Sequence, residues 1–258
     1  MTLDDLAEVP ALVLALPGLG WLVLAVMVAG LVRGFAGFGS AMIIMPVASS
    51  VLTPVGALTF LIMTELFGPL PNLRAGWRTC DRGDVARLSF GALVALPLGV
   101  YGLSRLPVDL FGWVVSGVVL VLLVALMSGW RYHGRLTPSL VTGTGALGGA
   151  MAGAVGLAGP PVIMLYMAST LPIAKIRATL LLFLFVIDLL MITVFAAWGL
   201  LLIEPMVAGV LLAVPYMLAN RAGALLFRPE TESRFRAVAY TIIAASAILG
   251  LPVFAAGH

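Results

Sequence analysis

The feature that most constrains this chain is a series of apolar runs, each about 20 residues long and separated by brief polar turns. A helix of about 20 apolar residues is long enough to cross the hydrocarbon core of a bilayer. Only 10% of the residues are charged, and the mean hydropathy is +1.17, whereas soluble domains carry about 25% charged residues. The sequence therefore predicts an all-α polytopic membrane protein with about eight transmembrane helices. The predicted helices lie at about 11–33, 57–73, 88–104, 109–130, 138–156, 178–198, 205–225 and 235–254.

Two glycine-rich stretches interrupt this pattern. The first reads RGFAGFGSAMIIMP from Arg33, and the second reads GAVGLAGPPVIM from Gly153. The apolar pieces that follow them, at about 38–52 and 160–171, are too short to span a bilayer alone. Glycine and proline are poor helix formers, and two successive prolines stop a preceding helix. We therefore expect two broken or re-entrant segments in addition to the spanning helices.

The distribution of basic residues predicts the topology. Four clusters contain most of the 14 Lys and Arg residues, and the positive-inside rule places all four in the cytoplasm. This assignment puts both termini in the periplasm and makes each glycine-rich stretch the bend of a hairpin or broken helix. The clusters are Arg74, Arg78, Arg82 and Arg87; Arg131 and Arg135; Lys175 and Arg177; and Arg221, Arg228, Arg234 and Arg236.

The two halves of the chain resemble each other. Gly34 and Gly37 align with Gly153 and Gly156 at an offset of 119 residues, and a Leu-Pro at 96–97 aligns with a Val-Pro at 214–215 at an offset of 118. The first copy starts outside and the second starts inside, which is the inverted-topology repeat found in many secondary transporters. We predict repeats at 1–130 and 131–258; a chance match of glycine-rich helices is the alternative.

The broken backbone offers a binding site for an anion. Helix N-termini expose free N–H groups and the positive end of the helix dipole, and broken backbone persists at membrane depth only beside protein or a water-filled cavity. Arg33 directly precedes the first break, and a guanidinium binds oxyanions with paired donors. Two roles fit Arg33: anion binding, or extension to the cytoplasmic headgroups. The predicted substrate-binding residues are Arg33, Gly34, Gly37, Phe38, Gly39, Ser40, Gly156, Gly159, Pro160 and Pro161.

Two carboxylates, Glu65 and Asp188, lie well inside predicted spans. Ionisable residues at this depth are candidates for proton or ion coupling, for pairing with Arg33, or for hydrogen bonds between helices. The chain has two histidines, outside the predicted spans, and a single cysteine, Cys80. It contains neither an HExxH motif nor a Walker loop. We therefore expect neither an enzyme nor a cofactor or metal site.

The two glycine-rich breaks, the proline that follows the first, and the ending GALLFRPETESRFRAVAYTIIAASAILG resemble the TauE/SafE sulfite exporter family over essentially the whole chain. Where that family typically has a GxGGG-like run, this chain has Gly-Phe-Gly-Ser at 37–40 and Gly-Pro-Pro at 159–161. The resemblance implies a carrier that exports sulfite or a small organosulfonate such as sulfoacetate.

The resemblance also implies the bacterial cytoplasmic (inner) membrane as the location. The expected partners are a small anionic substrate and the lipid bilayer, with no nucleic acid; a homodimer is compatible with the sequence. Three alternatives to an exporter stay open. They are an anion channel, an uptake carrier for another small carboxylate or sulfur anion, and a membrane scaffold that transports nothing.

Overall fold

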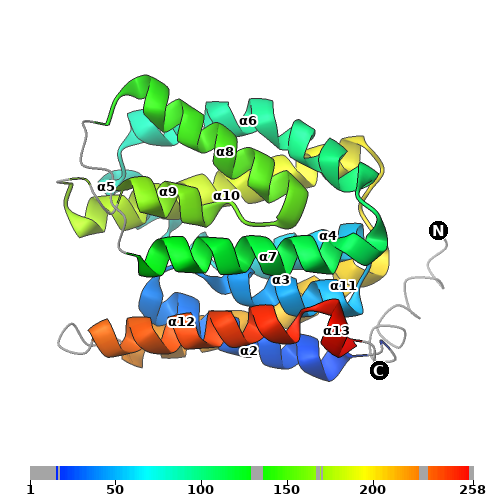
Figure 1. The fold of residues 1–258 in the computed structure, drawn as a ribbon. Coiled ribbons are helices and arrows are strands. Elements are labelled where there is room, and N and C mark those ends of the chain that lie inside the picture. Colours follow the sequence, from blue (N-terminus) through cyan, green and yellow to red (C-terminus); the bar gives the residue numbers. More distant parts are fainter. Residues whose placement is uncertain are drawn as a thin grey trace. The chain divides into compact units, whose positions relative to one another are not determined.

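The computed structural model describes residue 16 and residues 18–128, 136–166, 169, 171–226 and 232–255, except for the side chains of 232–236 and 254–255. These residues form helices joined by short turns and include no strand (Figure 1). The helices are α2 (Leu19–Ala36), α3 (Ser40–Val51), α4 (Pro54–Glu65), the 3-10 helix η1 (Leu70–Asn72), α5 (Leu73–Thr79), α6 (Arg82–Arg105), α7 (Val108–Met127), α8 (Pro138–Val155), α9 (Gly159–Tyr166), α10 (Ile173–Ala197), α11 (Ile203–Leu226), α12 (Glu232–Leu249) and α13 (Pro252–Ala255).

Five helices among the described residues are long and apolar enough to cross a membrane: α2, α6, α7, α10 and α11. The bent pair formed by α4 and the η1–α5 segment would make a sixth. The prediction of a helical, multi-pass membrane protein is confirmed, and the count of eight spans stays a prediction. Arg131, Arg135, Arg228 and both termini, on which part of the predicted topology depends, lie outside the described residues.

The predicted single helix at 57–73 is wrong. Helix α4 ends at Glu65, and the chain resumes as η1 and α5 with a bend of 43°. The segment between them reads Gly-Pro-Leu-Pro at 68–71. Two prolines this close remove backbone donors and clash with the preceding turn, so an α-helix cannot continue through them. As a result, the Glu65 carboxylate is in the last turn of a helix.

Helix breaks occur at both glycine-rich stretches. Helices α2 and α3 flank the first break, and α8 and α9 flank the second. The starts of α2, α3 and α4 precede the starts of α8, α9 and α10 by the same 119 residues (138 minus 19, 159 minus 40 and 173 minus 54). The order of helix, break, short helix and next helix therefore recurs in both halves of the chain.

The chain divides into two compact units. Unit 1 comprises residues 1–68, 107–120 and 199–258, and unit 2 comprises residues 69–106 and 121–198. In unit 1, α11 packs on α2 and α4, and α12 packs on α3. In unit 2, α6 packs along α8, and α10 packs on α5 and α6. Each unit thus combines helices from both halves of the sequence, and the assignment of repeats to 1–130 and 131–258 stays a prediction.

Glycines bring the main helices of each unit into backbone contact. A Cβ on Gly34 of α2 would collide with the backbone carbonyl of Asn220 on α11, and a Cβ on Gly145 of α8 would collide with that of Leu88 on α6. Small residues are what allow membrane helices to approach this closely. In unit 1, this contact holds the end of α2, which carries Arg33, directly against α11.

Candidate anion-binding site

The first break is a tight turn between α2 and α3. Gly37 has φ 81° and donates its backbone N–H to the carbonyl of Arg33 at 2.7 Å, which ends α2. Gly39 has φ 95° and precedes Ser40, the first residue of α3. Both φ values lie in the left-handed region, which glycine adopts without steric cost. The turn therefore places Ser40 beside the last turn of α2, and no side chain caps the N-terminus of α3.

Arg33 joins three helices of unit 1. Its Nη1 donates to Ser40 Oγ on α3 at 3.0 Å and to Glu65 Oε2 on α4 at 2.9 Å. The Arg33 and Glu65 side chains are only 11% and 10% exposed, so this is a buried ion pair. Of the two roles open for Arg33, this geometry favours a charge directed into the unit over one extended to the headgroups. Three of the predicted residues therefore meet at one point.

Two polar atoms of this cluster are buried without a hydrogen-bond partner in the described part of the chain. They are Glu65 Oε1 and the hydroxyl oxygen of Tyr216. Tyr216 is fully buried on α11, and its hydroxyl group lies close to Arg33, Glu65 and Ser40 without a well-aligned hydrogen bond to any of them. Buried polar groups are normally satisfied, because an unsatisfied one costs about 1–3 kcal/mol. The cluster thus contains one carboxylate oxygen and one hydroxyl group whose hydrogen-bonding capacity is not used within the described residues.

The remaining predicted residues of the first break differ in their surroundings. Gly34 packs against α11, as described above, so its side of α2 is filled by protein. Gly37 is exposed, and Phe38 and Gly39 are half-buried. Their roles in substrate binding stay predictions. Sequence reasoning missed Tyr216; its only signal was a tyrosine directly after Pro215 in the middle of an apolar helix.

The second break, in unit 2, carries no charged side chain. Gly156 has φ 76° and ends α8 by donating to the carbonyl of Ala152 at 2.9 Å. Helix α9 starts at Gly159, and Pro160 and Pro161 occupy its first turn, where missing N–H groups cost nothing. At the 119-residue offset, Arg33 corresponds to Ala152 and Glu65 to Leu184 (152 minus 33 and 184 minus 65). That this break contacts the substrate stays a prediction.

Asp188 lies half-buried on α10 in unit 2, whereas Glu65 lies in unit 1. Within unit 1, Arg33 forms an ion pair with Glu65. The role of Asp188 in ion coupling stays a prediction.

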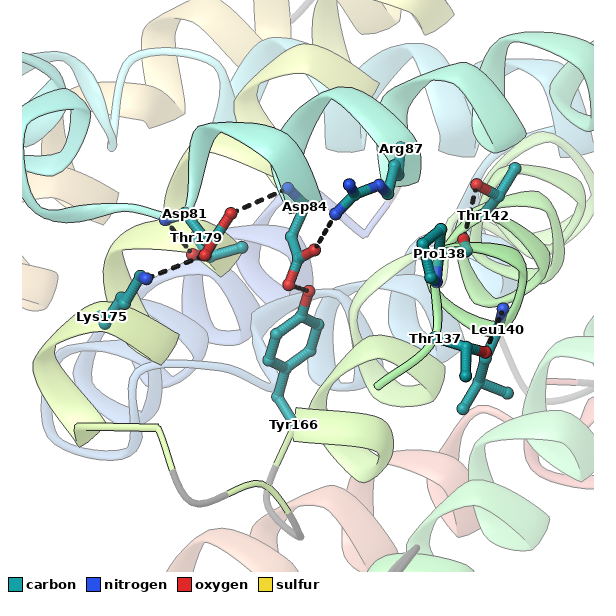
Figure 2. A network of polar contacts seen from close by, with 10 residues as sticks. All are labelled: Asp81, Asp84, Arg87, Thr137, Pro138, Leu140, Thr142, Tyr166, Lys175 and Thr179. Carbon is teal, nitrogen blue, oxygen red and sulfur yellow. Dashed lines mark hydrogen bonds and ion pairs between the residues drawn. The ribbon is translucent and has the colours of Figure 1, made fainter. Parts of the chain in front are cut away.

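A polar network that sequence reasoning missed ties three helices of unit 2 together (Figure 2). Asp84 on α6 is 8% exposed, and its two carboxylate oxygens accept hydrogen bonds from Arg87 Nη1 at 2.9 Å and from the Tyr166 hydroxyl group at 2.7 Å. Tyr166 is the last residue of α9. The network therefore connects the start of α6 to the end of α9. Because each oxygen of Asp84 has a partner within the protein, we assign the network a structural role.

Asp81 extends this network to α10. Its side chain caps α6 by accepting from the backbone N–H of Asp84 at 3.1 Å, and Lys175 Nζ lies 2.8 Å from its other oxygen. Its backbone N–H donates to Thr179 Oγ1 at 3.0 Å. The hydrogen bond from Lys175 is the main cause that lowers the pKa of Asp81 below its usual 3.8. The spacing Asp-x-x-Asp at 81–84 was the available signal, since Asp is a preferred helix N-cap.

The comparisons with known proteins agree with this architecture. The family model described as "Sulfite exporter TauE/SafE" matches residues 22–249, which is most of the chain. The chain belongs to the TauE/SafE sulfite exporter family. Neither the curated proteins nor the solved structures gave a significant match. The match covers the helices from α2 to α12, and therefore both glycine-rich breaks and the Arg33 cluster. The predicted family membership is confirmed, and with it the general class of membrane transporter.

Proposed function

We propose that this TauE/SafE protein is a secondary transporter that exports a small oxyanion, sulfite or a small organosulfonate such as sulfoacetate, across the cytoplasmic membrane by alternating access. The observation that supports it best is the buried cluster at the first break. There Arg33 is paired with Glu65, while Glu65 Oε1 and the Tyr216 hydroxyl group have no partner among the described residues. A scaffold protein would have no need for a buried charge surrounded by unsatisfied groups.

In this proposal Glu65 and the substrate compete for one cation. A buried guanidinium is compensated by a single negative charge, and an uncompensated buried charge is strongly destabilising. The substrate anion therefore displaces the Glu65 carboxylate from Arg33 Nη1, and Glu65 takes up a proton. The Tyr216 hydroxyl group and the uncapped N-terminus of α3 supply further donors to the anion. Release of the anion, together with loss of the proton from Glu65, restores the ion pair and returns the empty carrier.

The net charge of the transported species contributes to the direction of transport. A divalent anion that moves together with the proton taken up by Glu65 carries one net negative charge, and the inside-negative membrane potential favours exit of that charge by about 2.3 kcal/mol per 100 mV. The proposal includes an inverted repeat, which the constant offset of 119 residues between helix starts supports. It also includes the bacterial inner membrane as the location, with both termini in the periplasm.

The decisive experiment measures anion binding and flux in one set of variants. Purified protein is tested in a thermal-shift panel with sulfite, sulfate, thiosulfate, taurine, sulfoacetate and carboxylates, and then in proteoliposomes with the selected anion. We expect Arg33→Ala to abolish selective binding, and Arg33→Lys to restore part of it because lysine keeps the charge and loses the paired donors. Arg105→Ala is the matched control, since Arg105 is exposed and lies over the Tyr101 ring.

Each alternative gives a different result in these assays. Flux that does not saturate and that exceeds carrier rates would indicate an anion channel. Normal binding and transport in Arg33→Ala would exclude this site. A protein that binds none of these anions and moves none would be a scaffold, and the proposed function would be wrong.

A further inference from the structure

A groove of about 530 Å³ lies between α5 and α10, within unit 2. This volume is in the usual range for small-molecule sites, about 300–1,000 Å³. Helix α5 contributes Arg74, Trp77 and Arg78 to its lining, and α10 contributes an apolar wall that includes Leu182, Val186 and Leu189. The groove is separate from the Arg33 cluster, which belongs to unit 1.

Contacts between the two helices show how the groove runs. The backbone of Asp81, just after α5, bonds to Thr179, whereas Gly76 in the middle of α5 lies beside Leu181 and Leu182. Helix α5 therefore runs antiparallel to α10. The apolar wall from Leu182 to Leu189 extends about 10 Å along α10, at 1.5 Å per residue. It leads away from the end where Lys175 pairs with Asp81.

The charges identify that end as the cytoplasmic one. Lys175, Arg177, Arg82 and Arg87 gather there, which the positive-inside rule assigns to the cytoplasm. Trp77 is 52% exposed, and the Arg82 guanidinium lies 5.0 Å from the centroid of its ring. An exposed tryptophan beside arginines is typical of the membrane–water interface. The groove thus begins at headgroup level and continues into the hydrocarbon region.

The two arginines of the groove form no ion pair with the part of the chain that the structure describes. Arg74 and Arg78 are four residues apart, so they share one face of α5, and both are exposed. Two unpaired guanidinium groups at a membrane interface favour a phosphate, which arginine binds with paired hydrogen bonds.

We propose that this groove binds an anionic phospholipid of the cytoplasmic leaflet. Arg78 holds the headgroup phosphate, and Arg74 reaches it with its long side chain from about 6 Å deeper along α5. An acyl chain lies along Leu182, Val186 and Leu189. A free phosphate would match the two arginines but leave the apolar wall uncovered, whereas a lipid matches both. Basic pockets between transmembrane helices on the cytoplasmic side bind anionic headgroups in this way.

The test is lipid retention by the full chain in detergent, measured by native mass spectrometry with phosphatidylglycerol, cardiolipin and phosphatidylethanolamine. We expect the wild type to retain the two anionic lipids in preference to phosphatidylethanolamine. Each arginine near an anionic lipid surface contributes about fivefold in affinity, so Arg74→Gln with Arg78→Gln is expected to weaken retention about thirtyfold. Arg105→Gln is the control, because Arg105 is an exposed arginine at the opposite end of α6.

Two further variants keep the proposal testable if the double glutamine variant does not fold. Arg74→Lys with Arg78→Lys keeps the charge and should keep the preference for anionic lipids. Val186→Trp fills the apolar wall without changing the charge and should weaken retention of phosphatidylglycerol. Equal retention of all three lipids by the wild type, or wild-type retention by Val186→Trp, would overturn the proposal. Displacement of phosphatidylglycerol by inorganic phosphate alone would instead identify a small-anion site and would also overturn it.

Discussion

Replacement of Glu65 by Gln is the sharpest test of the proposed competition for Arg33. The change is nearly isosteric, and the amide oxygen of the new side chain can still accept from Arg33 Nη1, as Glu65 Oε2 does at 2.9 Å. What is lost is the negative charge that competes with the substrate. An anion from solution then meets a weaker competitor for Arg33.

The expected change in anion affinity follows from the hydrogen bond between Arg33 Nη1 and the side chain at position 65. A hydrogen bond that involves a charged group contributes about 1.5–3 kcal/mol; the bond between two charged groups lies at the upper end of this range, and a bond in which only the guanidinium is charged lies at the lower end. The competitor is therefore weakened by about 1.5 kcal/mol, which corresponds to about tenfold tighter anion binding. In the proposed competition, anion binding to the wild type weakens as pH rises, because Glu65 has to take up a proton when the anion binds. This pH dependence of anion binding should be absent in Glu65→Gln.

Stability and binding should change together. The Glu65→Gln protein without anion is expected to be less stable by the same amount, about 1.5 kcal/mol. This is less than the loss of about 3–5 kcal/mol for removal of one partner of a buried ion pair, because the amide keeps the hydrogen bond to Arg33. Because the anion binds only the folded protein, it should restore part of this loss by mass action. Sulfite or sulfoacetate should therefore raise the melting temperature of Glu65→Gln more than that of the wild type.

The assay is a thermal-shift titration of each protein from pH 5 to pH 8, followed by flux in proteoliposomes over the same range. Glu204→Gln is the matched control, because Glu204 is an exposed carboxylate in the first turn of α11. Weaker or unchanged anion binding in Glu65→Gln, with a wild-type pH profile, would refute the competition. In that case Glu65 is a structural partner of Arg33.

Three further predictions concern the fold. Gly145→Ala should lower the free energy of unfolding by about 1–3 kcal/mol, because its Cβ would meet the α6 backbone. Gly143→Ala on the same helix should be neutral or slightly stabilising, because its Cβ meets nothing within 4 Å. Chemical denaturation of the two variants measures the difference. The lowered pKa of Asp81 stabilises the folded state at neutral pH, and this contribution is lost as pH falls below about 4. Asp81→Asn should therefore reduce the acid-induced fall in melting temperature. Cysteines introduced near residues 2 and 256 on a Cys80→Ser background should both be labelled from the periplasmic side; labelling from opposite sides would exclude the predicted topology.

Some of the candidate site could be predicted from the sequence because it depends on local backbone chemistry. Gly37 and Gly39 adopt positive φ values that other residues avoid, and Pro160 and Pro161 occupy the first turn of a helix. Such preferences act over a few residues and need no partner. The bend after Glu65 belongs to the same class, since Gly-Pro-Leu-Pro was present to predict it.

That this chain forms a bundle of apolar helices with two glycine-rich breaks follows from its residues alone, since helix length, apolarity and backbone strain are all local properties. Which side chains meet depends on tertiary packing. Arg33 pairs with Glu65, 32 residues away, and Tyr216 reaches the same cluster from α11. The sequence does not show that Glu65 lies within reach of Arg33, because this depends on which helices pack together. In unit 1 the glycine contact between α2 and α11 brings side chains from distant parts of the chain to one buried point.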